Sequence, residues 1–208
     1  MKITPLNKQN VTLILFTLYC IMLLLSRSYI TKNSNYFFLL WNLMLAGIPY
    51  LMMLFLKTNK VLQKKYFIIF MCFMWLLFLP NSFYIVTDFV HLHSGRKSLF
   101  WFDMILLSSF TILGFTLGTI SLSDFEKIVS QKKYAKTILI PLICFLCGFG
   151  IYLGRIERYN SWNIVNDPLK LITDLLILCS SYNAILFSLL FGSFIYIIFL
   201  AKKHLMSS

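Results

Sequence analysis

The sequence predicts an all-α bundle of about six membrane-spanning helices, and three features support this prediction. Hydrophobic residues make up 59% of the 208 residues, whereas Asp, Glu, Lys and Arg make up only 12%, against roughly 25% in a soluble domain. The hydrophobic residues form runs of about 20, the length at which a helix crosses the hydrocarbon core. Strict alternation of polar and apolar residues, the pattern of a membrane β-barrel, is absent. Helices are therefore expected to satisfy the backbone in lipid.

The apolar runs predict the position of each span in a single membrane domain that covers residues 1–208. The six predicted spans are 11–29, 36–56, 66–87, 99–120, 134–154 and 171–200. The first run follows two lysines, as in a signal sequence, but no small-x-small cleavage site follows it, so we expect an uncleaved span. Small residues repeat at helical spacing on the fourth and fifth runs, which predicts close helix packing in lipid. These residues are Thr111, Gly114, Gly118 and Ser121, and Cys147, Gly150 and Gly154.

Basic residues predict the orientation of the spans. The N-terminus, segments 57–65 and 121–136 and the C-terminus hold twelve of the 19 Lys and Arg residues, and the opposite side holds seven. Because basic residues favour the cytoplasmic side, both termini are expected in the cytoplasm. The net charge of +12 is thereby explained by topology, and no nucleic-acid partner is predicted. All four arginines lie on the outer side, which indicates a need there for the planar guanidinium.

The third predicted span carries the first candidate site. Its apolar run breaks at Pro80, and at 100° per residue Asn81, Tyr84, Asp88 and His91 fall within about an 80° arc of one helix. The proline is expected to kink the helix. One interpretation is an ordinary helix end that emerges into water. The other is a functional or structural polar network, because the rest of the helix circumference stays apolar.

The segment that follows the fifth span is the second candidate site. Arg155 and Arg158 lie about one helical turn apart, with Asn160 close by in sequence. Paired guanidiniums bind phosphate or carboxylate groups well, so an anion site is one interpretation. In the other, one of these arginines neutralises Asp88 in a structural ion pair. The sequence leaves both open.

Two carboxylates, Asp103 and Asp174, lie within predicted spans near their outer ends. A charged Asp in the bilayer is costly, so both are expected to face a cavity or a partner. Asp88 and His91 have the spacing of two metal ligands, but this spacing is unspecific and no metal site is predicted. General acid–base work by His91, oriented by Asp88, is the preferred chemistry. No Walker loop or dinucleotide-binding turn occurs, and the sequence identifies no cofactor.

Several segments together resemble the bacterial multi-pass membrane family catalogued as domain of unknown function 1361. The segments that carry the resemblance are Trp41-Asn42-Leu43-x-Leu45-Ala46-x-Ile48-Pro49, Leu79-Pro80-Asn81-x-x-Tyr84-Ile85-Val86-Thr87-Asp88-x-x-His91-Leu92, Trp101-Phe102-Asp103 and Gly154-Arg155-x-x-Arg158-x-Asn160-Ser161-Trp162. The resemblance covers the second to sixth spans. It implies a bacterial membrane protein of several spans and no established activity.

Three function hypotheses follow for a multi-pass protein of the cell membrane. The first is an enzyme that acts on an anionic envelope substrate, such as a lipid headgroup or a lipid-linked carrier. Its candidate catalytic residues are His91, Asp88, Asp103 and Asp174, and its candidate anion-binding residues are Arg155, Arg158, Asn160, Tyr84 and Asn81. The second is a transporter of small solutes or protons. The third is a non-catalytic accessory protein, in which the polar residues lock the bundle or dock a partner.

Overall fold

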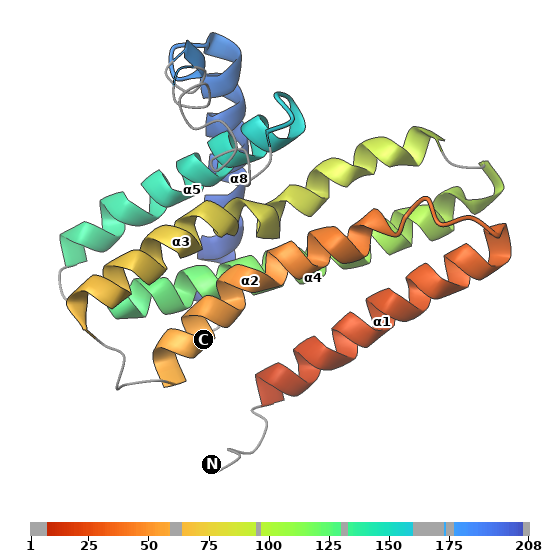
Figure 1. The fold of residues 1–208 in the computed structure, drawn as a ribbon, viewed down its shortest axis with the longest axis horizontal. Helices are drawn as coiled ribbons and strands as arrows, with labels where there is room; N and C mark the ends of the chain where they lie inside the picture. The colour runs from red at the N-terminus through yellow and green to blue at the C-terminus, as the bar shows by residue number, and fades with distance from the viewer. Residues whose placement is uncertain are drawn as a thin grey trace.

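Figure 1 shows the computed structural model, which describes residues 8–58, 64–94, 97–129, 133–159, 173 and 177–205. Within these residues six helices are long and apolar enough to cross a membrane, and no strand occurs. They are α1 (Lys8–Thr31), α2 (Phe38–Thr58), α3 (Lys65–Tyr84), α4 (Phe100–Val129), α5 (Lys133–Arg155) and α8 (Tyr182–Leu205). Two 3₁₀ helices, η2 (Ile85–Ser94) and η3 (Lys97–Leu99), connect α3 to α4. The predicted fold class, an all-α bundle of membrane-spanning length, is confirmed.

The end of α3 differs from the expected continuous helix. The α-helical part stops at Tyr84, and residues 85–94 continue as the 3₁₀ helix η2. Pro80 removes one backbone donor from the helix, and three β-branched residues follow at 85–87, where they lower helix propensity. Residues three apart share a face of a 3₁₀ helix. Asp88 and His91 therefore stay on one side, whereas Asn81 and Tyr84 belong to the preceding α-helix.

The last span also begins later than expected. Residues 179 and 180 form a turn, and α8 starts at Tyr182 rather than near residue 171. The Ile185 N–H donates to the Ser181 carbonyl oxygen at 3.1 Å, which places Ser181 at the N-cap position. Serine favours this position over a helix interior. The preference of Ser181 for the N-cap position therefore agrees with the start of α8 at Tyr182.

The fourth helix, α4, is the centre of the bundle. In its most apolar 18-residue stretch 78% of the residues are buried, against 22–39% in the other five spans. Helices α1, α2 and α3 and the 3₁₀ helix η2 all pack against it. Helix α8 instead packs mainly on α5 and crosses it obliquely in the view of Figure 1. Most of the other elements are therefore arranged around α4.

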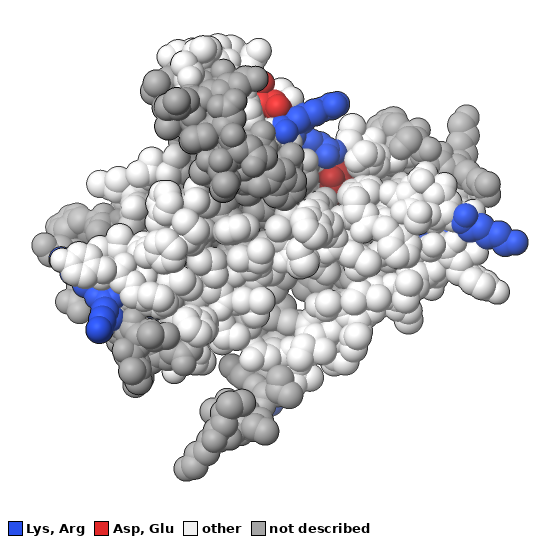
Figure 2. All heavy atoms as spheres, viewed as in Figure 1, with Lys and Arg blue, Asp and Glu red and all other residues white. Residues whose placement is uncertain are grey.

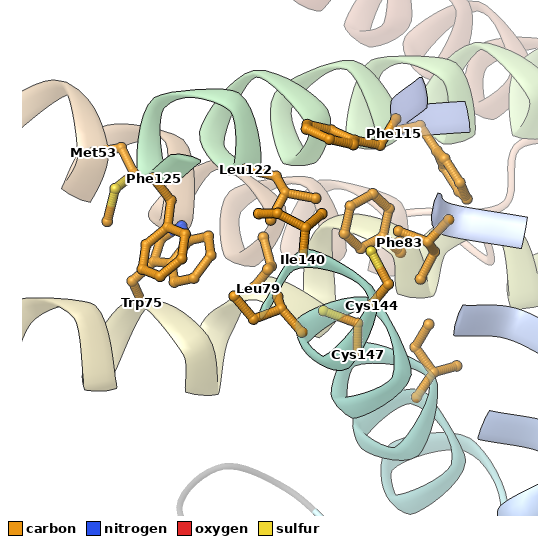
Figure 3. Close-up of a cluster of buried hydrophobic side chains, with 14 of the residues drawn as sticks. Met53, Trp75, Leu79, Phe83, Phe115, Leu122, Phe125, Ile140, Cys144 and Cys147 are labelled. Atoms are coloured by element: carbon orange, nitrogen blue, oxygen red, sulfur yellow. The ribbon is translucent and has the colours of Figure 1, made fainter. Parts of the chain in front are cut away.

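Aromatic side chains of α3 and α4 fill the core between these helices and α5 (Figure 3). Trp75 stacks on Phe125 with ring centroids 4.3 Å apart, and Phe83 meets Phe115 edge to face at 5.1 Å. The Trp75 indole N–H donates to the Ser121 hydroxyl at 2.6 Å, and that hydroxyl donates to the Pro49 carbonyl at 3.0 Å. One serine of α4 thus connects α3 and α2.

Glycines set the closest helix contacts, as the small-residue pattern predicted. A Cβ added at Gly118 would lie 2.7 Å from the Phe83 ring, and one at Gly150 would lie 2.6 Å from the Pro80 ring. The contact between α5 and α8 is equally close and involves backbone, because a Cβ at Gly148 would lie 2.6 Å from a backbone oxygen of α8. Close backbone approach of this kind is how helices pack in lipid.

Charged side chains mark the two borders of the bundle. We call the border with Arg27, Asp88, Asp103 and Arg155 the arginine end, and the border with Lys57, Asp124, Glu126 and Lys203 the lysine end. On α4, Asp103 and Asp124 are 21 residues apart, or about 31 Å along a helix, close to the roughly 30 Å of a hydrocarbon core.

Both described ends of the chain lie at the lysine end. The Tyr50 hydroxyl donates to Asn10 near the start of α1 at 2.9 Å, and Lys203 near the end of α8 pairs with Glu126 at 2.7 Å. An even number of spans requires this arrangement. The assignment of this border to the cytoplasm stays a prediction.

Candidate functional site

Asp88 is the centre of the first polar cluster at the arginine end. Its side chain is only 1% exposed. The Asn42 amide of α2 donates to Oδ2 at 2.8 Å, and Arg155 at the end of α5 donates from Nη1 to Oδ1 at 3.2 Å. The carboxylate therefore joins α2, η2 and α5. Both of its oxygens already accept hydrogen bonds from the chain itself.

Arg155 is the cation of this cluster, and several partners hold it. Besides Asp88, Nη1 donates to the Tyr84 hydroxyl at 3.3 Å, and Nη2 donates to the Thr87 carbonyl at 2.6 Å. The guanidinium also lies over the Tyr84 ring, 5.6 Å from its centroid, in the arrangement of a cation–π contact. Gly154 leaves room for that ring, because a Cβ there would lie 3.3 Å from it. The Arg155 side chain remains 23% exposed, so one edge of the cluster faces outward.

Asp103 is the centre of a second cluster at the arginine end. Arg27 of α1 donates to both carboxylate oxygens through Nε and Nη2, the bidentate geometry that gives guanidinium–carboxylate pairs their strength. The Tyr36 hydroxyl shares its proton between Asp103 Oδ2 at 3.3 Å and the His91 carbonyl at 3.4 Å. Burial, and next the neighbouring Asp103 carboxylate, raise the pKa of Tyr36. The phenol therefore stays neutral and keeps its role as a donor.

His91 lies between the two clusters. Its ring packs against Phe38 with centroids 5.0 Å apart, and its side chain is half-buried. It follows Asp88 by one turn of η2 and is joined to the Asp103 cluster through its backbone carbonyl. Among the residues that the structure describes, no group of three His, Cys, Asp or Glu side chains is arranged to hold a metal ion.

The other predicted site residues lie apart from these clusters or outside the described residues. The Asn81 amide donates to the Phe78 carbonyl of its own helix at 3.0 Å. Arg158 is exposed beyond the end of α5, where its φ of 58° places it in the left-handed conformation that ends a helix. Asn160 and Asp174 lie outside the described residues. The structure thus brings together Tyr84 and Asp88 with Arg155, and Asp103 with the His91 backbone.

The sequence-based site missed three partners, namely Tyr36, Asn42 and Thr87. Asn42 had a usable signal, because it is the one amide inside the apolar run 36–56. Thr87 contributes only a backbone carbonyl, and Tyr36 lies in a connecting segment, so residue type alone indicated neither. Arg27 was among the four outer arginines, but nothing in the sequence indicated which acid it meets.

The combined arrangement is a neutralised polar layer rather than an open cleft. Two carboxylates, each 1% exposed, are each paired with one guanidinium. In the view of Figure 2, blue basic and red acidic side chains form a small group beside the arginine end of α5, and most of the remaining described surface is white and therefore uncharged, apart from basic groups at the two sides. A buried carboxylate paired in this way can act as a base only if its ion pair opens.

Comparison with known proteins gives one match. A family model described as a protein of unknown function, DUF1361, matches residues 41–198, which include most of α2, all of α3 to α5 and the first part of α8. No curated protein and no solved structure matches the chain.

Proposed function

Since the chain belongs to the DUF1361 family, for which no function is described, we propose from its geometry a non-catalytic, multi-pass membrane accessory protein. In this proposal the arginine end is a fixed polar surface that locks the helices and offers the outward edge of Arg155 to a partner. One observation carries it: Asp88 and Asp103 are both buried, and all four of their carboxylate oxygens accept hydrogen bonds from the chain. Carboxylates whose oxygens are occupied by donors from other helices are expected to hold those helices together.

The energetics of buried ion pairs support this proposal. Removal of one partner of such a pair costs roughly 3–5 kcal/mol, because it leaves an unpaired charge in a medium of low polarity. Asp88 and Asp103 each join helices that are distant in sequence, so they favour one arrangement of the bundle over others. Catalysis by either carboxylate would require that arrangement to open in every turnover.

An enzyme that acts on an anionic envelope substrate is the second candidate. His91 favours it, because this half-buried imidazole lies one 3₁₀ turn from Asp88. In this alternative the outward edge of Arg155, with Arg158, would bind a phosphate or carboxylate, and His91 would transfer a proton to or from the bound group. Asp88 would then orient His91 while it remains paired with Arg155.

A transporter of small solutes or protons ranks third. Such a protein needs polar groups along the whole path, but the central helix carries no ionisable residue between Asp103 and Asp124. Several hydroxyls in that interval donate to carbonyls of their own helix, as Ser109, Thr116 and Ser123 do at about 2.7 Å. Proton flux into liposomes that is lost in Asp103→Asn protein would move this candidate to first place.

The test compares variants that separate a lock from a catalyst, in a strain that lacks the gene and at matched membrane levels. If the accessory proposal holds, His91→Ala complements the deletion phenotype as well as the wild type does. The neutral double variant Asp88→Asn/Arg155→Gln stays folded in the membrane, because it leaves no unpaired charge, but it loses complementation, because the edge of Arg155 that meets the partner is gone. Arg155→Ala alone loses complementation and folded protein together, as measured by fluorescence-detected size-exclusion chromatography.

The opposite result defines the enzyme. If His91→Ala fails to complement while its chromatographic profile and melting temperature equal those of the wild type, the imidazole has a chemical role and the accessory proposal is wrong. His204→Ala is the matched control, because it removes a histidine from the lysine end of α8 and should complement in either case.

A further inference from the structure

A groove of about 660 Å³ lies between α1, α4 and α8, and Val86 of η2 also lines it. Its wall is mainly apolar and includes Leu13, Ile112, Phe115, Phe194 and Ile198. Ile112 is 56% exposed although it belongs to the central helix. The groove is therefore open on the side that faces lipid, and its volume lies in the range of about 300–1,000 Å³ typical of ligand sites.

The extent of the groove along the helices matches one leaflet. On α4 the lining runs from Thr111 to Ile120, and on α8 from Phe194 to Lys202. These stretches rise by about 14 Å and about 12 Å, close to half of the roughly 30 Å hydrocarbon core. Ile120 is four residues from Asp124, so the groove begins near the lysine end and reaches toward the middle of the membrane.

Lys202 gives the groove a charged mouth at the lysine end. Its side chain is half-buried, and its Nζ donates to the Ser123 hydroxyl at 3.5 Å. Among the described residues it forms no salt bridge, whereas Lys57 and Lys203 pair with acids at 2.9 Å and 2.7 Å. Gln9 of α1 lines the same groove and adds a neutral amide. The mouth therefore combines a positive charge with a hydrogen-bonding group.

We propose that this groove binds one anionic phospholipid from the leaflet at the lysine end. One acyl chain lies along the apolar wall between α1 and α8, and the phosphate meets the ammonium of Lys202. The charge selects the occupant, because lysines near the membrane surface attract anionic headgroups. The apolar wall by itself would accept any chain. The phosphate position at Lys202 lies at the opposite border from the proposed surface at the arginine end.

Native mass spectrometry of the full-length protein, titrated with phosphatidylglycerol or phosphatidylcholine of identical acyl chains, tests this site. We expect wild type to bind phosphatidylglycerol about five-fold more tightly, the factor that one lysine near an anionic surface supplies. Lys202→Gln should remove this preference. Lys203→Gln, which removes one positive charge from the adjacent position, should keep it, and so should Lys202→Arg.

A second variant tests the apolar wall independently of charge. Thr116→Trp fills the groove from α4 and should weaken the binding of both lipids while the melting temperature shows folded protein. Equal phosphatidylglycerol affinity in wild type and Lys202→Gln would overturn the proposal. So would a lipid-free dimer that Thr116→Trp dissociates, because the groove would then be an interface between two copies of this chain.

Discussion

At the scale of single residues, two hydroxyl groups on α4 show that hydrogen-bond partners decide whether a buried polar side chain stabilises the fold. Ser121 accepts from Trp75 and donates to the Pro49 carbonyl, so both its proton and its oxygen are used. The Thr111 hydroxyl oxygen is buried and has no hydrogen-bond partner among the described residues. A buried hydroxyl without a partner retains its desolvation penalty.

Opposite mutational effects are therefore expected at these two positions. Thr111→Val keeps the side-chain shape and should stabilise the protein by about 1 kcal/mol, because it removes the unpaired oxygen. Ser121→Ala should destabilise it by about 1–3 kcal/mol, since the Trp75 N–H loses its acceptor in the core. Melting temperatures in one detergent measure both. A lower melting temperature for Thr111→Val would show that its hydroxyl has a partner.

The sequence left open which arginine of the site pairs with which acid. The sequence placed Asp88, Asp103, Arg155 and Arg158 at one border, and it offered an ion pair with Asp88 as one of two interpretations. The structure pairs Asp88 with Arg155, whereas Arg158 lies beyond the helix end in a left-handed conformation. Which guanidinium meets which acid depends on where α5 ends and how helices are arranged, and neither follows from spacing along one chain.

At the scale of elements, the crossing of α5 and α8 depends on the absence of side chains. A Cβ on Gly192 would lie 2.8 Å from the Phe145 Cα atom, and one on Gly148 would meet the α8 backbone. A backbone atom, unlike a flexible side chain, cannot move aside without shifting its helix. The contact between α5 and α8 therefore has little tolerance for larger residues.

Gly192→Ala should consequently separate α5 from α8. We expect a loss of about 1–3 kcal/mol, the range for overpacked interiors. Gly47→Ala is the matched control, because a Cβ on Gly47 meets nothing within 4 Å and alanine in a helix is favoured over glycine by roughly 0.5–1 kcal/mol. Thermal denaturation followed by circular dichroism compares them. Equal melting temperatures for the two variants would contradict the close contact.

Sequence predicted the elements better than it predicted their ends. Hydrophobic length located all six spans, because crossing lipid requires a long apolar run whatever the neighbours are. The change from α3 to η2 and the late start of α8 were missed. Both depend on a few residues that disfavour a continuous α-helix, namely Pro80 and the pair Ser180 and Ser181. A hydrophobicity average over about 20 residues does not detect such local preferences.

At the scale of the whole molecule, α4 holds the bundle through an acid near each end. Asp103 binds Arg27 of α1 at the arginine end, and Asp124 binds Lys57 of α2 at 2.9 Å at the lysine end. The Asp103 pair is buried, whereas the Lys57 side chain is 46% exposed. Mutation of the Arg27–Asp103 pair should therefore lower the free energy of unfolding far more than mutation of the Lys57–Asp124 pair, because exposed pairs contribute about 0–1 kcal/mol.

A double-mutant cycle measures this difference. Arg27→Leu alone should destabilise the protein by roughly 3–5 kcal/mol, because Asp103 stays buried without its cation. The double variant Arg27→Leu/Asp103→Leu should recover most of the loss, since no charge is left unpaired. The cycle on Lys57 and Asp124 should give less than about 1 kcal/mol of coupling. Comparable coupling at both ends would contradict the assigned burial.

The two borders should also be distinguishable in intact cells. With the exposed Cys179 replaced by Ser, a membrane-impermeant maleimide should label Arg158→Cys from outside. It should label Lys203→Cys only after the membrane is permeabilised, because lysine-rich borders face the cytoplasm. Labelling of both positions from the same side would contradict the assignment of the arginine end and the lysine end to opposite sides of the membrane.

The separation of Asp103 and Asp124 has one more consequence. Since one rigid helix fixes the distance between these charged groups, the protein cannot adapt to lipids of another length without tilting or dragging a carboxylate into hydrocarbon. Such hydrophobic mismatch carries a modest energy for each ångström. The chain should therefore resist heat best in membranes of intermediate lipid length, and both shorter and longer lipids should weaken it.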